Sequence, residues 1–334
     1  MAGSTASDRS LSATAEFPAQ WRTQVMTVRP TATRRLPALS AGGPLTEAVG
    51  WVVAGRYRLR RLLGRGGMGV VWLAEDEALR RPVAIKRLYL SGLVTDEERL
   101  AARARLHREA RLAARVDHPG TVRVYDIAQD TSDPWIVMEA LPGQTLKAAL
   151  HDQGTLPVGQ VASLGLRLLD ALVATHRAGI VHRDVKPANV QLCGGPRVVL
   201  TDFGIAASAE DGTGTSTDKI VGSPAFMAPE QVQGGEFEPA SDLFSLGATL
   251  YAAVEGRPPF GKGSPLATLT AIVDEPPAPL LHAGPLGPVI EGLLVKDPAR
   301  RLSPAQARGA LRAIQRGDSP RRIPIRPLLA ACLS

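Results

Sequence analysis

The sequence predicts an α+β fold of two lobes, a small antiparallel β-sheet lobe with one main helix followed by a mainly helical lobe. Two observations predict the first lobe. Short alternating segments joined by a glycine-rich turn fill residues 57–73, and one helical segment at 96–116 separates them from later strands. The third observation predicts the second lobe, because long apolar segments of helical period, notably 158–178 and 242–253, follow.

The composition fits a globular chain and gives no sign of nucleic-acid binding. The chain has 334 residues, of which 44% are apolar, so it is long enough for two lobes with cores of their own. Its net charge is +7 and its pI about 9.8, but aromatic residues make up only 4% and the basic residues are scattered. A nucleic-acid surface needs a basic stripe or a stacking platform, and neither is expected here.

Cysteine usage and apolar runs predict a cytoplasmic protein without membrane insertion. Cys193 and Cys332 are the only cysteines, which gives no disulfide framework and fits a reducing compartment. The apolar run at 323–333 is too short for a membrane helix, and Pro324 and Pro327 interrupt it. The first residues contain no apolar core like that of a signal peptide.

Composition divides the chain into three regions. Residues 1–55 mix Ser, Thr, Ala, Pro and Arg without periodicity, and we expect a flexible extension there. One folded domain is expected over 56–315, with a first lobe at about 56–140 and a second at about 141–315. Residues 316–334 are then a short tail.

The first lobe is expected to begin with a β-hairpin. Residues 57–62 alternate like a strand, glycines at 64, 66 and 69 form a turn, and β-branched residues resume a strand at 70–73. Because glycine has no Cβ, the backbone N–H groups of such a turn can approach phosphate groups closely. A dinucleotide-binding turn is the rival interpretation, but it requires a helix after the glycines.

Three further segments complete the first lobe. Residues 82–86 read as a strand that ends in Lys86, whose ordinary role would be a solvated charge. The helix at 96–116 contains Glu109, and glutamate is commonplace on helices. Strands are expected at 121–128 and 135–139.

The strongest chemical signal lies at residues 180–192, where Asp184, Lys186 and Asn189 occupy a tight loop between apolar runs. A rigid loop of this kind positions polar side chains better than a mobile tip does, although a solvated polar loop is the alternative. A second acid, Asp202, follows directly on the apolar strand at 198–200. The two acids are therefore candidates for a single site.

The second lobe is expected to be built from helices. Helical segments are predicted at 145–150, at 158–178 and at 242–253, the second of them ending at a glycine C-cap. A last helix is expected to run to about residue 315, because Ser303 and Pro304 are an N-cap residue and a proline in the first helical position.

The order of these motifs resembles the eukaryotic-like serine/threonine protein kinases of bacteria, over about residues 57–315. The matching motifs are G-x-G-x-x-G at 64–69, V-A-I-K at 83–86, H-R-D-x-x-x-x-N at 182–189, D-F-G at 202–204 and A-P-E at 228–230. The resemblance implies the two-lobed protein kinase fold. It also makes the polar stretch at 206–220 an activation segment.

The resemblance implies a role for each polar residue. Asp184 would accept the proton of the substrate hydroxyl, and Lys186 would neutralise the γ-phosphate. Lys86, held by Glu109, would contact the α- and β-phosphates. Glu230 and Arg301 would form a buried ion pair that braces the activation segment. These last two are given by the family pattern alone.

The resemblance also implies ATP as the nucleotide, with Mg²⁺, or Mn²⁺ in its place, held by Asn189 and Asp202. The residues expected around the nucleotide come from both lobes. They are Leu63, Gly64, Gly66, Gly69, Val71, Ala84, Lys86, Met138, Glu139, Leu141 and Leu192. Met138 would border the adenine pocket, and 139–141 would be the hinge between the lobes.

The family pattern implies protein substrates with serine or threonine acceptors, since Lys186-Pro187 after the acid is typical of that specificity. The chain itself would be one substrate, with autophosphorylation at Thr215 and Thr217. Arg183, beside the catalytic acid, would pair with the phosphate. The sequence does not define an oligomeric state.

Two other functions share this fold and are weighed against it. A pseudokinase or scaffold would have lost one of Lys86, Asp184, Asn189 and Asp202, and all four are present. A small-molecule phosphotransferase of kinase-like fold would ordinarily lack the peptide-binding A-P-E segment, which is intact at 228–230. A protein kinase is therefore the function that the sequence favours.

Overall fold

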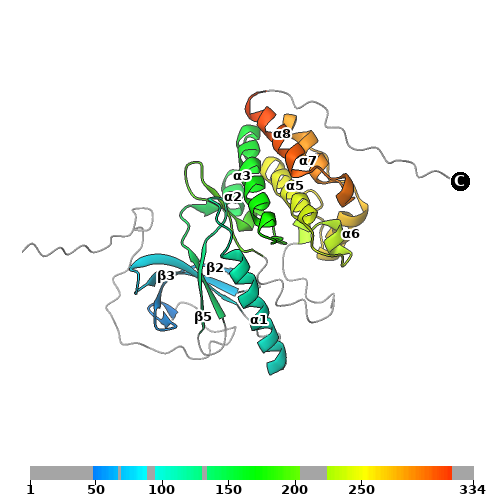
Figure 1. Ribbon diagram of the computed structural model, residues 1–334. Coiled ribbons are helices and arrows are strands. Elements are labelled where there is room, and N and C mark those ends of the chain that lie inside the picture. Colours follow the sequence, from blue (N-terminus) through cyan, green and yellow to red (C-terminus); the bar gives the residue numbers. More distant parts are fainter. Residues whose placement is uncertain (1–47, 67–68, 89–94, 130–133, 204–223, 318–334) are drawn as a thin grey trace, which may run out of the picture.

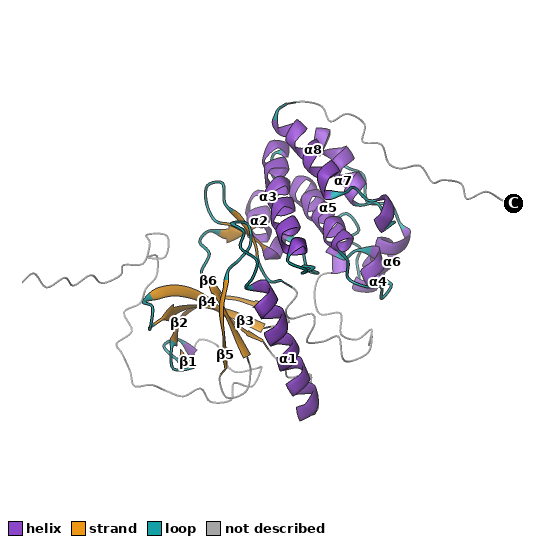
Figure 2. Cartoon of the chain, in the orientation of Figure 1, coloured by secondary structure: helices purple, strands orange, loops and turns teal. Residues whose placement is uncertain are grey.

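The computed structural model describes residues 48–66, 69–88, 95–129, 134–203 and 224–317, which form two lobes (Figure 1). The N-lobe holds a six-stranded antiparallel sheet in the order β1-β2-β3-β4-β6-β5, together with helix α1. The strands are β1 (Val52–Val53), β2 (Tyr57–Gly66), β3 (Gly69–Asp76), β4 (Arg81–Leu88), β5 (Val124–Gln129) and β6 (Pro134–Glu139). Figure 2 shows the larger sheet together with α1 in one lobe and the other labelled helices in the second lobe.

The glycine-rich segment is a hairpin, as predicted, and the rival dinucleotide-binding turn is excluded because a strand follows it. Gly64 pairs with Val71 and Gly66 with Gly69. The two strands therefore include glycines that were expected to belong to the turn. Gly69 has a φ of +152°, and a Cβ there would lie 2.0 Å from the carbonyl oxygen of Arg87. Only glycine therefore lets β3 approach β4 this closely.

The two faces of the N-lobe sheet are buried in different cores, which follows from the alternation of side chains along a strand. Ile85 of β4 and Val137 of β6 pack on one face with Trp72. Ala84 and Met138, their neighbours in sequence, pack on the other face, which α1 also covers. Lys86 shares this second face, and its polar end is thereby directed toward the C-lobe.

The folded N-lobe begins earlier than the sequence indicated, since residues 48–53 lie within the stretch assigned to a flexible extension. Ala48, Trp51 and Val53 are buried in the same core as Trp72. Val52 and Val53 form β1, which pairs with Arg58 and Tyr57 of β2. A strand of two residues is too short to show alternation of apolar and polar residues in the sequence, so it was not predicted.

Helix α1 (Asp96–Ala113) begins with a capping box, in which Thr95 and Glu98 each bond the other's backbone. Its buried residues, Leu106, Ala110 and Ala113 among them, face the sheet. The helix ends three residues before the expected 116, because Ala114 is already its C-cap. The prediction of one main helix in this lobe is confirmed.

A second, three-stranded sheet lies where the lobes meet. It contains β7 (Gln144–Thr145), β8 (Val190–Leu192) and β9 (Val198–Leu200), in that order. Thr121, from the turn after α1, forms a parallel bridge with Leu200. The sheet therefore joins the segment that enters the C-lobe, the loop at 180–192 and the strand before Asp202.

The C-lobe is helical, as predicted. Its helices are α2 (Leu146–Gln153), α3 (Val158–Arg177), α4 (Pro229–Val232), α5 (Pro239–Glu255), α6 (Pro265–Asp274), α7 (Gly287–Leu293) and α8 (Pro304–Gln315). Helix α5 lies in the middle of the core, and α3 packs against both α5 and α8. Helix α8 begins at the predicted Ser303 cap, whereas α4, α6 and α7 were not predicted.

Helix α3 is long and apolar enough to cross a membrane by length and composition, and it is the only such helix in the described part of the chain. Half of that stretch is buried inside the protein. Its buried residues, such as Leu168 and Leu172, pack in the same core as Phe244 and Leu250 of α5. These contacts are those of a C-lobe core helix.

Candidate active site

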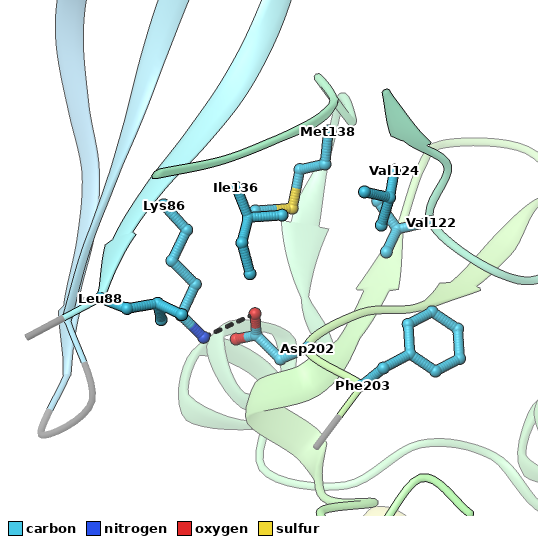
Figure 3. Close-up of a pocket in the computed structure, with 8 residues that line it drawn as sticks. All are labelled: Lys86, Leu88, Val122, Val124, Ile136, Met138, Asp202 and Phe203. Atoms are coloured by element: carbon cyan, nitrogen blue, oxygen red, sulfur yellow. Dashed lines mark hydrogen bonds and ion pairs between the residues drawn. The ribbon is translucent and has the colours of Figure 1, made fainter. Parts of the chain in front are cut away.

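A pocket lies where the N-lobe sheet meets the three-stranded sheet (Figure 3). Its lining is apolar except for one cation and one acid. The lining residues are Lys86, Leu88, Val122, Val124, Ile136, Met138, Asp202 and Phe203. An apolar pocket with a few convergent polar groups is the usual form of a small-molecule site.

Lys86 and Asp202 form an ion pair across the two lobes, with Nζ 2.8 Å from Oδ1 (Figure 3). Asp202 follows β9 in a left-handed backbone conformation with φ of +57°, which is strained for a residue with a Cβ. Burial raises the pKa of its carboxyl, but the charge and hydrogen bond of Lys86, with smaller contributions from His182 and Lys186, more than offset this, so the pKa lies below its usual value. Asp202 is therefore held ionised at neutral pH.

The loop at 180–192 holds the predicted acid between a cation and an amide. Lys186 Nζ lies 2.8 Å from Oδ1 of Asp184. The amide Nδ2 of Asn189 donates to both Oδ2 and the backbone oxygen of Asp184, each at 2.8 Å. One side chain thus fixes the position of the acid, and among the described residues none donates to the Oδ1 of Asn189.

His182 connects this loop to the strand that carries Asp202. Its buried ring donates from Nε2 to the carbonyl oxygen of Thr201 at 2.9 Å, and its Nδ1 accepts from the N–H of Asp184 at 3.3 Å. We assign the tautomer from these two partners. Burial is the main reason that the pKa of His182 lies below its usual 6.5.

We expect this neutral histidine to make the fold sensitive to acid. Below about pH 6.5 His182 binds a proton in the unfolded chain but stays neutral in the folded chain. The free energy of unfolding therefore decreases as the pH is lowered, by up to about 1.4 kcal/mol per pH unit. Denaturant unfolding at pH 7.5, 6.5 and 5.5 measures this slope. In His182→Gln the free energy of unfolding should change less steeply with pH than in wild type, whatever the absolute stability of the variant. Equal slopes in the two proteins would contradict the prediction.

Asp242, at the start of α5, anchors the same loop. Its carboxylate, of which 1% is exposed, accepts the backbone N–H groups of His182 and Arg183 at 2.8 and 2.9 Å. It also bonds Nε2 of His176 at 2.7 Å. Sequence reasoning placed Asp242 only as the start of a helix, although an acid at the head of an apolar helix was a signal. The guanidinium of Arg183 lies over the ring of Phe237, 4.7 Å from its centroid.

The predicted ion pair between Glu230 and Arg301 is confirmed. The guanidinium makes two bonds to the carboxylate, of 2.9 and 3.1 Å, and only 1% of the Arg301 side chain is exposed. Arg301 also donates to the carbonyl oxygens of Ala240, Val295 and Lys296. It therefore connects the A-P-E segment to the first turn of α5 and to the segment between α7 and α8.

The residues expected around a nucleotide are distributed over the walls of this region. Val71, Ala84, Met138 and Leu141 pack in one apolar cluster, and Leu192 lies at the edge of the C-lobe core. Leu63, Gly64 and Gly66 are exposed on the β2–β3 hairpin, and Gly69 is buried against β4. Their contact with a nucleotide stays a prediction.

Two groups of predictions are not tested by these contacts. Lys86 is paired with Asp202, and Glu109 lies half-buried on α1, so the pairing of Lys86 with Glu109 stays a prediction. Thr215 and Thr217, with the rest of 204–223, lie outside the described residues.

The predicted metal ligands fit magnesium in character. Asp202 offers carboxylate oxygens and Asn189 an amide oxygen, and hard oxygen ligands are those that Mg²⁺ prefers. Within the described residues no cluster of three or more His, Cys, Asp or Glu could hold a metal. Mg²⁺ that binds together with substrate phosphates takes only one or two carboxylates from the protein, and Asp202 and Asn189 would be the protein ligands in a site of that kind.

Comparisons with known proteins agree with this geometry. Residues 57–310 match the family described as Protein kinase domain. The chain is 40% identical over 264 residues to the probable serine/threonine-protein kinase SCO3848 of Streptomyces coelicolor, covering 76% of this chain and 39% of that protein. It is 37% identical over 291 residues to the serine/threonine-protein kinase PknA of Mycobacterium tuberculosis, covering 84% and 67%.

A third relative gives the same picture. The chain is 38% identical over 276 residues to the serine/threonine-protein kinase PknB of Mycobacterium leprae, covering 79% of this chain and 44% of that protein. The chain thus matches between about two fifths and two thirds of the length of these relatives.

Proposed function

Because the chain belongs to the bacterial eukaryotic-like serine/threonine protein kinases, we propose that it transfers the γ-phosphate of ATP to serine and threonine hydroxyls of proteins. The predicted fold class is confirmed, since the sheet lobe and helical lobe described above are those of this family. One observation carries the proposal. Asn189 fixes Asp184 by two hydrogen bonds while Asp202, the other predicted metal ligand, pairs with Lys86.

In the proposed reaction Asp184 orients the acceptor hydroxyl and takes its proton as the oxygen bonds to the γ-phosphorus, while the bond from that phosphorus to the β,γ-bridging oxygen breaks and ADP is the leaving group. Its side chain is held in place by contacts with Asn189 and Lys186. Lys186 would then exchange its bond to Asp184 for the transferring phosphate, and Lys86 would hold the other phosphates. Magnesium bound to Asp202 and Asn189 would neutralise charge that develops on the phosphate oxygens.

The nucleotide base would lie in the apolar cluster between the lobes. Val71 and Ala84 come from the N-lobe sheet, and Leu141 comes from the segment that leaves β6. No described residue accepts the backbone N–H of Leu141, whereas the N–H of Glu139 donates to the carbonyl oxygen of Arg123. Adenine recognition by the backbone of 139–141 is thus supported by the apolar walls and by one available donor, the N–H of Leu141.

A pseudokinase and a small-molecule phosphotransferase are the alternatives. The linked contacts of Lys86, Asp184, Asn189 and Asp202 speak against the first, because a scaffold gains nothing from them. The buried pair of Glu230 with Arg301 speaks against the second, because it holds the A-P-E segment that would bind a peptide.

Incubating the purified chain with labelled ATP, Mg²⁺ and a generic protein acceptor tests the proposal. Phosphoserine or phosphothreonine should form, and none should form without the metal or with Lys86→Met. Label on tyrosine alone would contradict the assigned specificity. ATP binding without any transfer to protein would favour the pseudokinase or, if a small-molecule acceptor is labelled, the other alternative.

We expect autophosphorylation at Thr215 and Thr217 to raise activity, with the phosphate paired by Arg183. Thr215→Ala/Thr217→Ala should lower the rate of peptide phosphorylation by about tenfold, the effect of losing a charge-assisted contact worth 1–2 kcal/mol. Thr155→Ala, in an exposed C-lobe loop, is a matched control. Full activity of the double variant would contradict the prediction.

The proposed partners are protein substrates with serine or threonine acceptors and the chain itself. A cytoplasmic location is proposed on two grounds, the supply of ATP and the presence of only two cysteines in the sequence. No nucleic-acid partner and no membrane insertion are proposed. We propose that the kinase domain spans 56–315; the family match covers 57–310.

A further inference from the structure

Arg197 joins three segments at the junction of the lobes. Its Nη1 and Nη2 donate to the two carboxylate oxygens of Glu139, at 2.7 and 3.0 Å. Its Nε donates to the carbonyl oxygen of Pro119 at 3.2 Å. Glu139 is the last residue of β6, Pro119 lies in the turn after α1, and Arg197 precedes β9. One guanidinium therefore holds the hinge against both lobes.

The position of Arg197 follows from the turn between β8 and β9. The N–H of Cys193 donates to the carbonyl oxygen of Arg197 at 3.1 Å and closes the turn. Gly194 and Gly195 both have positive φ, of 80° and 60°, which glycine adopts at little cost. Pro196 follows them. The turn thus sets Arg197 directly across from Cys193, next to the end of β6.

A second contact holds the far end of the hinge. The amide Nε2 of Gln191 donates to the carbonyl oxygen of Pro142 at 2.9 Å. Gly143 approaches β8 so closely that a Cβ there would lie 1.9 Å from the carbonyl oxygen of Leu192. Residues 140–141 therefore lie between two points fixed to the same hairpin.

The pair of Arg197 with Glu139 differs from an ordinary surface ion pair. Nη1 and Nη2 of Arg197 make parallel bonds to the carboxylate of Glu139, and this geometry fixes the orientation of the two side chains as well as the distance between them. The side chains are 37% and 17% exposed, so the pair is partly shielded from water. The Arg197 hydrogen bond to Glu139 and the nearby Glu139 charge hold the pKa of the guanidinium above its usual value.

We propose that Arg197 is a positioning residue for nucleotide binding, which presets the hinge backbone that receives adenine. The inference rests on the proposed function, in that 139–141 form the adenine site. A preset backbone loses less conformational freedom when the ligand binds, so affinity rises without a new contact to the ligand. Arg197 does not touch the reacting atoms, and it acts on binding of the base.

Arg197→Met keeps the aliphatic stem and removes the guanidinium. We expect the KM for ATP to rise about tenfold, the effect of losing one charge-assisted contact, with kcat changed less than twofold. Because the contact of Arg197 with Glu139 is proposed to act on binding of the adenine base, the Kd of adenosine should rise by the same factor. Lys86→Met is the reciprocal variant, since it should weaken ATP binding and leave adenosine binding unchanged.

Two further variants separate positioning from general stability. Arg308→Met removes a comparable guanidinium, which pairs with Asp170 between α8 and α3, far from the hinge in sequence. It should leave the KM for ATP and the Kd of adenosine unchanged. Glu139→Gln should resemble Arg197→Met, and the double variant should be no worse than either single one, because both remove the same contact.

The outcomes of this inference differ from those of the kinase assay. The inference is overturned if adenosine binds Arg197→Met as tightly as wild type, or if the losses in Arg197→Met and Glu139→Gln simply add. It is overturned also if wild type binds no adenosine. If wild type binds adenosine but transfers no phosphate, the proposed function fails, while the Kd values still decide the inference. Should Arg197→Met not fold, Arg197→Lys is measured instead, with a smaller rise in Kd expected.

Discussion

Asp184→Asn is expected to lower kcat by about 10²- to 10⁴-fold, the usual contribution of a general base. Asparagine has nearly the same shape, and its oxygen can still accept from Nδ2 of Asn189. It cannot take up the proton of the acceptor hydroxyl, and it loses the ion pair with Lys186. Single-turnover phosphorylation of a peptide, with ATP above its Kd, measures the chemical step.

Asp170→Asn is the matched control, because Asp170 is an acid on α3 that pairs with Arg308 away from the pocket. Its kcat should stay within twofold of wild type. ATP binding should be nearly unchanged in both variants, since neither residue is expected to touch the nucleotide base. A threefold loss or less in Asp184→Asn would remove Asp184 from the role of base.

Glu230→Gln is expected to lower the free energy of unfolding by about 3–5 kcal/mol, as when one partner of a buried pair is removed. Glutamine keeps an acceptor for Arg301 but leaves its charge uncompensated in a site where 1% of that side chain is exposed. Burial raises the pKa of Glu230, but the hydrogen bond and charge of Arg301, together with the hydrogen bond from Ser241 and a backbone hydrogen bond, outweigh it, so the pKa lies below its usual 4.5. Denaturant unfolding at pH 7 measures the loss.

The sign of the acid dependence follows from that lowered pKa. The stabilisation from Glu230 is fully present above about pH 4.5 and is lost as pH falls through the folded-state pKa. Glu275→Gln is the control, because its pair with Lys262 is nearly half exposed and should contribute less than about 1 kcal/mol. Adding Arg301→Met to Glu230→Gln should recover part of the loss. A change below about 1 kcal/mol in Glu230→Gln would show that the pair does not brace the segment.

The sequence predicted elements best where a local signal was strong. Helix α8 begins at its predicted cap because Ser303 and Pro304 specify a helix start by themselves. Ser264 and Pro265 carry the same signal at the start of α6, and Ser264 does accept from the N–H of Ala267. That helix could have been predicted and was missed. Helix α7 starts at Gly287 without a side-chain cap, so it offered no comparable signal.

Most connections within the candidate site were not predicted from the sequence, the exception being the pair of Glu230 with Arg301, which the family pattern implied. Asp184, Asn189 and Asp202 stand in motifs whose spacing alone suggests their chemistry. The anchoring by Asp242 joins residues 59 and 60 positions apart, and the pair of Arg197 with Glu139 joins residues 58 apart. Such contacts depend on how the helices and strands pack, and no local pattern records them.

Asp242 attaches the loop at 180–192 to helix α5, and this limits how the loop can move. Helix α5 is buried along nearly its whole length, so it belongs to the part of the fold that opens last. The N–H groups of His182 and Arg183 bond its first acid, and the loop therefore shares the cooperative unit of the C-lobe core. We therefore expect that local unfolding does not release Asp184 by itself. We expect opening and closing to come from movement of whole lobes about the proposed hinge, with the carboxylate of Asp184 carried along as a rigid part of the larger lobe.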